Sequence, residues 1–248
     1  MKDIKSTILD RRSIRRYERE SISQENMEFI YDAICNTPTS YNGQQFSVID
    51  VADQSMKERL YEIIGQKQIK TCSHFLIFCA DYNKISQIAD AKLIEMPEFQ
   101  NTADGVIVGV VDATLAMMNA LIAAESCGLG TCPIGYARTA APEALSRLLK
   151  LPPKVFVVCG LAIGVPREFP DLKPKQPKKL MIFSNEYPQE SLVPDLLDYD
   201  ETIKEYNATR SGTKTDNDWA SHIISYYQEA MSYCTLNALR RRGFDIKR

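Results

Sequence analysis

Histidine is scarce in this chain, and its scarcity excludes several kinds of site. His74 and His222 are the only two among 248 residues, and neither stands at a ligand-like spacing from a second histidine or a cysteine pair. A zinc or iron centre is therefore not expected. Nucleophilic schemes of the Ser-His-Asp and Cys-His kinds each need a histidine base, so they are disfavoured as well. We expect His74 to be structural and His222 to lie on a helix face.

Cysteine is present, but not in the patterns that bind metals or build disulfide frameworks. The seven cysteines include no Cys-x-x-Cys pair, and their odd number argues against a secreted, disulfide-stabilised protein. Most are expected to be small core residues. The first residues show no apolar stretch like a signal peptide, and no segment is expected to be an uninterrupted membrane span. These features favour a cytoplasmic protein.

The chain also lacks an excess of charge of one sign. Thirty basic residues face 32 acidic ones, for a formal net charge of -2. No global field therefore draws the protein to nucleic acid or to an anionic membrane. The sequence contains neither a Gly-x-Gly-x-x-Gly fingerprint after a strand nor a Gly-x-x-x-x-Gly-Lys-Ser/Thr loop. A bound phosphate must then be held mainly by side chains.

Four arginines do stand together, within residues 11–17. An arginine guanidinium is a planar fork of donors that matches phosphate oxygens, and Ser13 with neighbouring backbone N–H groups completes such a cradle. The segment therefore predicts a site for a phosphate monoester. A short arginine run is also typical of a solvated surface. A third reading uses Tyr17 to stack on nucleic-acid bases, which the acidic net charge argues against.

Hydrophobic patterns predict alternating helices and strands. Ser23 predicts the cap of a helix that ends near Asn36, followed by a polar loop over residues 37–44. Strands are predicted over residues 46–51, 74–79 and 155–163. An apolar helix over residues 105–128 should be buried against a sheet and another surface, for which a second subunit is one candidate. This order indicates an α/β or α+β domain.

The remainder of the chain is read from its glycines and prolines. Gly128 and Gly130 are able to take left-handed backbone angles and supply a tight exit from that helix, leading into a short extended piece that ends at Gly135. A helix should follow over residues 142–150. Prolines and charges predict an irregular excursion over residues 165–216. A last helix is expected to carry Trp219, Ile223, Tyr227 and Met231 on one face.

Six segments occur in one order along nearly the whole chain, and together they resemble a known family. They are Arg12-Ser13-Ile14-Arg15, the loop from Thr39-Ser40 to Gln44, Gly65-Gln66-Lys67, Val110-Val111-Asp112-Ala113, residues 120–130, and Asp171-Leu172-Lys173-Pro174-Lys175. The series is similar to the nitroreductase family, and specifically to its NADPH-preferring branch of oxygen-insensitive nitroreductases and NADPH-flavin oxidoreductases.

The resemblance implies an α+β fold with a central, mostly antiparallel sheet flanked by helices. Residues 1–164 would form the FMN-binding core. Residues 165–248 would form an irregular carboxy-terminal excursion and a helix that wraps the core and a partner subunit, within a single structural domain overall. The protein would be a homodimer with one FMN per subunit, held in clefts formed by both chains.

The resemblance also assigns site residues. Arg11, Arg12, Ser13 and Arg15 would hold the FMN phosphate and ribityl chain. The other implied cofactor contacts come from the polar loop, the Gly65 segment, the end of the extended piece and the excursion: Thr39, Ser40, Gln44, Gln66, Lys67, Ile134, Gly135, Lys173 and Lys175. The 2′-phosphate of NADPH would meet Arg210 and Lys214, although a solvated loop fits these two equally well. No metal and no catalytic side chain is implied, because the flavin carries the chemistry.

The implied activity is FMN-dependent oxidation of NADPH, or of NADH. In this hypothesis the donor passes a hydride to FMN, leaves, and is replaced in the same cleft by a nitroaromatic, quinone, azo compound or free flavin, in a ping-pong cycle. The partners would be these small molecules and a second subunit, with no nucleic acid and no membrane. The alternative is a non-catalytic flavin-binding or flavin-carrier protein, which would share the same phosphate site but would not turn over NAD(P)H.

Overall fold

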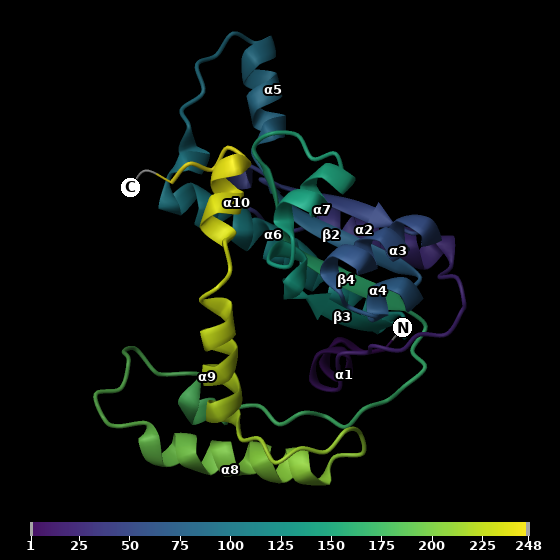
Figure 1. The fold of residues 1–248 in the computed structure, drawn as a ribbon, viewed down its shortest axis with the longest axis vertical. Coiled ribbons are helices and arrows are strands. Elements are labelled where there is room, and N and C mark those ends of the chain that lie inside the picture. Colours follow the sequence, from purple (N-terminus) through teal and green to yellow (C-terminus); the bar gives the residue numbers. More distant parts are fainter. Residues whose placement is uncertain (1, 247–248) are drawn as a thin grey trace. The chain divides into compact units, whose positions relative to one another are not determined.

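The fold is that of a computed structural model, which describes residues 2–246 (Figure 1). The described chain divides into two compact units. The first contains the residues up to Glu168 together with those from Cys234 onward, and the second runs from Phe169 to Tyr233. Each unit is described by itself.

The first unit is built on one sheet of four strands in its described residues. The order is β1 (Phe46–Val51), β2 (His74–Asp81), β4 (Val155–Gly164) and β3 (Gly130–Ile134). Every neighbouring pair is antiparallel. The central strands β2 and β4 are buried almost throughout, which explains their continuous apolar sequences. The three predicted strands and the α+β class are confirmed.

One face of the sheet is covered by α2 (Gln24–Cys35), α6 (Ala103–Ser126) and α10 (Thr235–Arg241). The Ser23 hydroxyl accepts the Asn26 N–H and Asn36 follows the last turn of α2, as predicted from the sequence. Thr102 caps α6 in the same way. These helices bury Ile30, Leu76 and Leu161 in one hydrophobic cluster.

The opposite face is covered by α3 (Gln54–Ile64), α4 (Gln68–Thr71) and α7 (Pro142–Leu148). They bury a second cluster that contains Leu60, Phe75 and Leu145. The predicted helix over residues 142–150 is therefore confirmed, two residues shorter than expected. The helices α1 (Ile4–Leu9) and α5 (Asn83–Ala91) also belong to this unit.

Helix α6 corrects the expectation that no segment resembles a membrane span. By length and composition it is apolar enough to cross a membrane. Its most apolar 18 residues have a mean hydropathy of 2.0, and 44% of them are buried inside the protein. It contacts α2 and β2 along the core. A core helix covered on one side by a sheet meets the same apolar criteria, so this helix is weak support for a membrane location.

Two glycines after α6 are required for different physical reasons. Gly128 has φ +80°, a left-handed angle that glycine takes without strain. Gly130, which is also able to take such an angle, does not have a positive φ. Gly130 lies instead against Ile14, and a Cβ on it would stand 2.8–2.9 Å from the atoms of that side chain. Close packing, not backbone conformation, requires glycine there.

The second unit corrects the expectation of an irregular excursion over residues 165–216. It contains the 17-residue helix α8 (Val193–Thr209), which begins with a proline in its first turn and buries Tyr199, Ile203 and Asn207. This spacing of four residues was masked in the sequence by the many charges between them. The predicted last helix is confirmed as α9 (Trp219–Ala230), with His222 exposed on it. The Trp219 ring packs edge-on against Tyr199, with centroids 5.6 Å apart.

Candidate functional site

The arginine segment lies along the free edge of β3. Ser13 forms a parallel bridge with Thr131, and the Ile14 N–H donates to the Thr131 carbonyl at 2.8 Å. On its other side the Arg15 N–H donates to the carboxylate of Glu168 at 2.7 Å. Ile14 points into the core, whereas Arg15 is exposed. Ile14 and the buried Tyr17 thus anchor the segment in the core, while Arg15 and Arg16 between them are exposed.

A buried polar atom in this segment has no partner. The Nε of Arg11 is inaccessible to solvent and makes no hydrogen bond within residues 2–246. An unsatisfied guanidinium N–H is costly in the interior of a protein. The donors of Arg11, Arg12 and Arg15 fit a phosphate group, which supplies hydrogen-bond acceptors.

Glu125 at the end of α6 lies behind the segment. It is buried, and its carboxylate accepts the Thr131 hydroxyl at 2.6 Å. Burial raises the pKa of Glu125, and the hydrogen bond from Thr131 and the charge of Arg11 oppose this rise. One carboxylate thus acts on both Thr131 of β3 and the first arginine of the segment.

The Gln66–Gln68 segment reaches the same edge of the sheet. The Gln68 amide donates to Gln66 at 3.2 Å and approaches the Cys132 sulfur at 3.8 Å. Burial raises the pKa of the Cys132 thiol, while the nearby charge of Arg15 acts against the rise. Gln66, the exposed Lys67 and the arginine segment are therefore brought to one region through β3.

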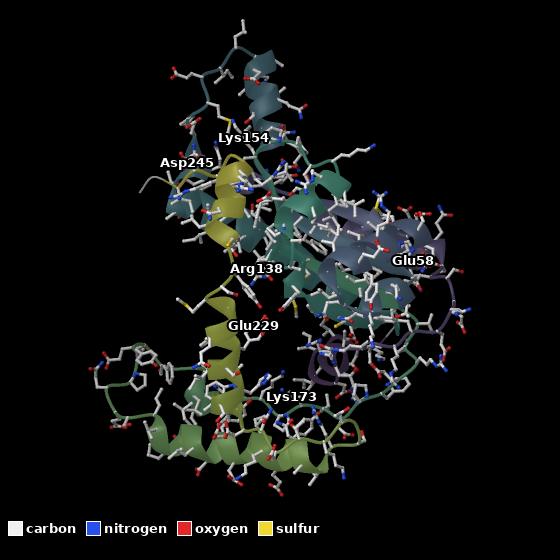
Figure 2. The ribbon with its side chains drawn as sticks, viewed as in Figure 1. Glu58, Arg138, Lys154, Lys173, Glu229 and Asp245 are labelled. Atoms are coloured by element: carbon white, nitrogen blue, oxygen red, sulfur yellow. The ribbon has the colours of Figure 1, made fainter. Side chains whose placement is uncertain are left out.

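Ile134 and Gly135 end β3 on this edge. Ile134 is buried and lies opposite Gly160 of β4, and Gly135 is exposed. The Arg138 side chain, labelled in Figure 2, reaches back to the Gly135 carbonyl at 3.4 Å. Gly135 thus carries no side chain over its exposed backbone, and its carbonyl accepts from Arg138.

The polar loop contains a short 3₁₀ turn over Ser40–Asn42 and has an unusual backbone. Tyr41, Asn42 and Gln44 have φ of 58°, 52° and 51°, in the left-handed region that residues with a Cβ rarely adopt. Within the loop the Thr39 hydroxyl accepts the Gln44 N–H at 3.2 Å. The loop is thus held in a specific conformation, which loop propensity alone does not predict.

The sheet keeps this loop away from the arginine segment within one chain. The loop leads into Phe46 on edge strand β1, whereas Ser13 lies beside edge strand β3. Three strand spacings, about 14 Å, separate the two edges. The register also puts them at opposite ends of the strands, because Thr131 is aligned with Ile163 and His74, at the Val51 end of β1. The two groups occupy diagonally opposite corners.

An apolar surface lies on the outer side of α6. Ile107, Val111, Leu115 and Met118 are exposed and recur at helical spacing along it. Beside them an open groove of about 740 Å³ is lined by residues of α1, α2 and α6, among them Ile4, Phe29, Asn119 and Ile122. Exposed apolar surface of this extent is typical of an interface.

The remaining expected site residues belong to the second unit. Lys173, labelled in Figure 2, and Lys175 are exposed on the extended chain that precedes α8. Arg210 and Lys214 lie in the loop between α8 and α9. The Nε of Arg210 donates to the Thr213 carbonyl at 2.5 Å, so this side chain shapes its own loop.

Several residues that build the site were not singled out from the sequence. Glu168 and Gln68 give no local signal, because each acts on residues that only the fold brings close. Asp112 and Glu125 are polar residues within the apolar sequence of α6. A charge in such a helix signals a specific partner, but the sequence does not say which one.

Comparisons of this chain with family models, with known proteins and with solved structures agree with one another. Residues 8–165 match the family model described as the nitroreductase family, and residues 173–247 match the model of that family's C-terminal domain. An FMN reductase [NAD(P)H] of Bacillus subtilis is 36% identical over the full length of both chains. An oxygen-insensitive NADPH nitroreductase of Salmonella typhimurium is 37% identical over 86% of this chain and 85% of its own. The solved structure of the hypothetical oxidoreductase YcnD from Bacillus subtilis superimposes over both whole chains with a TM-score of 0.94 at 37% identity.

Proposed function

This chain belongs to the nitroreductase family, and on that premise we propose that it is an FMN-dependent NAD(P)H oxidoreductase. The observation that carries the proposal is the arginine segment on the edge of β3, which brings Arg11, Arg12 and Arg15 together beside Ser13. Their guanidinium groups supply the donors that a phosphate monoester such as that of FMN accepts. When bound, FMN supplies a ring that accepts a hydride and passes electrons on.

The chain's own residues bind and orient this cofactor. Arg11, Arg12, Ser13 and Arg15 hold the phosphate and ribityl chain, and Lys173 and Lys175 add positive charge. Gln66 and Lys67 contact the polar edge of the flavin, where a cation stabilises negative charge on the ring. The backbone at Ile134 and Gly135 passes close to the ring. No protein nucleophile is needed.

Thr39, Ser40 and Gln44 complete the site from a second copy of the chain. Within one chain they stand at the corner of the sheet opposite to the arginines, so they cannot line the same flavin. A homodimer related by a twofold axis, joined through the apolar face of α6 and the groove beside it, brings one loop to each arginine segment. The segment after residue 164 is proposed to wrap the partner.

NADPH is the proposed donor, and quinones, nitroaromatics, azo compounds or free flavin are the acceptors in a ping-pong cycle. Arg210 and Lys214 supply cations for the 2′-phosphate of NADPH, in a Gly- and Ser-containing loop suited to closing over a ligand. For Arg210→Ala the ratio of kcat/KM with NADPH to that with NADH should fall. An unchanged ratio would remove this role from Arg210.

Titration with FMN, followed by flavin fluorescence, tests the phosphate site. Arg12→Ala and Arg15→Ala should each weaken binding about tenfold to a hundredfold, because each removes a charge-assisted hydrogen bond of about 1.5–3 kcal/mol. Arg19→Ala is the matched control, since Arg19 is an exposed arginine just outside the segment. Equal FMN affinity of all three variants would show that Arg12 and Arg15 do not bind the phosphate. Binding without oxidation of NADPH or NADH would leave the flavin-carrier alternative.

A further inference from the structure

A buried carboxylate holds the polar loop from behind. Asp112 lies in the middle of α6 with no exposed surface. Its Oδ1 accepts the Ser40 N–H at 3.0 Å, and its Oδ2 accepts the Gln45 N–H at 3.3 Å. The two oxygens thus hold the two ends of the turn that contains Tyr41, Asn42 and Gly43.

These two amides are the hydrogen-bond partners of Asp112 within the described chain. No lysine, arginine or histidine of residues 2–246 lies within ion-pair distance of it. A carboxylate is costly to bury unless its charge is satisfied, and backbone N–H groups are the partners that do so here. The loop therefore explains why a charged side chain stands in the centre of an apolar helix.

The loop needs such an anchor, because its conformation is locally unfavourable. Tyr41, Asn42 and Gln44 all have positive φ, which costs energy for residues that carry a Cβ. Side-chain packing does not compensate, since Tyr41 is 83% exposed. The bonds inside the loop, such as that from the Gly43 N–H to the Ser40 carbonyl at 2.9 Å, close the turn but do not tie it to the core.

We propose that Asp112 is a positioning residue for the flavin site, which fixes the loop so that Thr39, Ser40 and Gln44 are presented in one arrangement. The inference rests on the proposed function in taking these three as cofactor contacts. Asp112 does not touch the flavin and acts only through the backbone of Ser40 and Gln45. Because the loop serves the site of the other subunit in the proposed dimer, Asp112 of one chain orders the cofactor site of its partner.

Asp112→Asn tests the proposal with almost no change in side-chain volume. An amide has one acceptor oxygen, and its NH₂ group would face a backbone N–H, so one anchoring bond is lost and a donor meets a donor. Asp104→Asn is the matched control, because Asp104 is an exposed carboxylate in the first turn of the same helix. Both variants are compared with the wild type, free of FMN and loaded with it.

The first measurement is amide hydrogen exchange in the FMN-free protein. In Asp112→Asn the exchange of the Ser40 and Gln45 amides should become at least tenfold faster, while that of Ile77 in the central strand β2 stays unchanged. A general loss of stability would change Ile77 as well. Unchanged exchange at Ser40 and Gln45 would overturn the proposal.

The second measurement is FMN affinity under conditions where Ile77 keeps its protection. Asp112→Asn should raise the dissociation constant at least tenfold, and Asp104→Asn should leave it within twofold of the wild type. A faster-exchanging loop with unchanged FMN affinity would overturn the positioning role. If the wild type does not bind FMN at all, the proposed function fails, and the exchange result then stands as a separate test of the anchor.

Should Asp112→Asn not fold, the wild-type protein still tests the anchor. Its Ser40 and Gln45 amides should exchange at least a hundredfold more slowly than the amide of the exposed Tyr41 between them. Similar rates for all three would contradict the proposal.

Discussion

At the scale of single residues, Glu125, which lies beside the arginine segment, makes the free energy of unfolding depend on pH. Burial raises its pKa, so the folded chain keeps a proton on Glu125 at pH values where the unfolded chain has lost it. This contribution to the free energy of unfolding is fully present below the unfolded pKa near 4.5 and is lost as pH rises through the folded pKa. Above the pKa values of the unfolded and the folded chain, Glu125 is charged in both states, and its buried charge lowers the free energy of unfolding.

Glu125→Gln removes this dependence while keeping an acceptor for the Thr131 hydroxyl. The free energy of unfolding of the wild type minus that of the variant should therefore decrease as pH rises from 4.5, and then level off. Denaturant titrations between pH 4 and 8 measure it. Glu62→Gln, a change at an exposed residue of α3, is the control and should give a nearly constant difference. A difference that rises with pH for Glu125→Gln would show that its pKa is lowered in the fold.

At the scale of secondary-structure elements, the spacing between β3 and the arginine segment depends on Gly130. A Cβ there would meet Ile14 at 2.8–2.9 Å, and one of the atoms it meets is the Cβ of Ile14, which cannot move without the backbone. Gly130→Ala should thus displace the segment and weaken FMN binding about tenfold or more, equal to at least ~1.4 kcal/mol.

Gly212→Ala is the matched control for this prediction. An added Cβ at Gly212 meets no atom within 4 Å, and its φ is not in the left-handed range, so FMN affinity should not change. Equal FMN affinities of the two alanine variants, measured by fluorescence titration, would show that the arginine segment tolerates a shift at β3.

Elements with strong local signals were the ones that the sequence predicted. The strands β1, β2 and β4, the cap of α2 and the presence of α6, two residues displaced from its predicted bounds, follow from hydrophobic runs and one serine. Helix α8 was missed because charges outnumber its buried residues. The shape of the polar loop depends on Asp112, some seventy residues away in the chain, and no local pattern reports such a contact. Likewise the pairing of residue 13 with Thr131 is a product of the fold.

At the scale of the whole molecule, we expect each cofactor site to need two chains. A mixed dimer can test this, with one tagged chain carrying Arg12→Ala and Arg15→Ala and a differently tagged chain carrying Thr39→Ala and Gln44→Ala. One of its two sites then combines both defects, and the other combines the intact arginines with the intact loop. The mixed dimer should bind one FMN with wild-type affinity, whereas neither variant homodimer should.

The homodimers of the two variants are the controls in that experiment. If the arginines and the loop served one site within a single chain, both sites of the mixed dimer would be defective. No high-affinity FMN binding would then be restored. Fluorescence titration of the doubly purified dimer distinguishes the two arrangements by stoichiometry.

A visible spectrum decides whether this chain is an FMN-dependent NAD(P)H oxidoreductase. The purified protein is loaded with FMN and its spectrum is recorded anaerobically before and immediately after one equivalent of NADPH. We expect a yellow flavin spectrum that bleaches. A protein that stays colourless after incubation with FMN, or a bound flavin that neither NADPH nor NADH reduces, would contradict it.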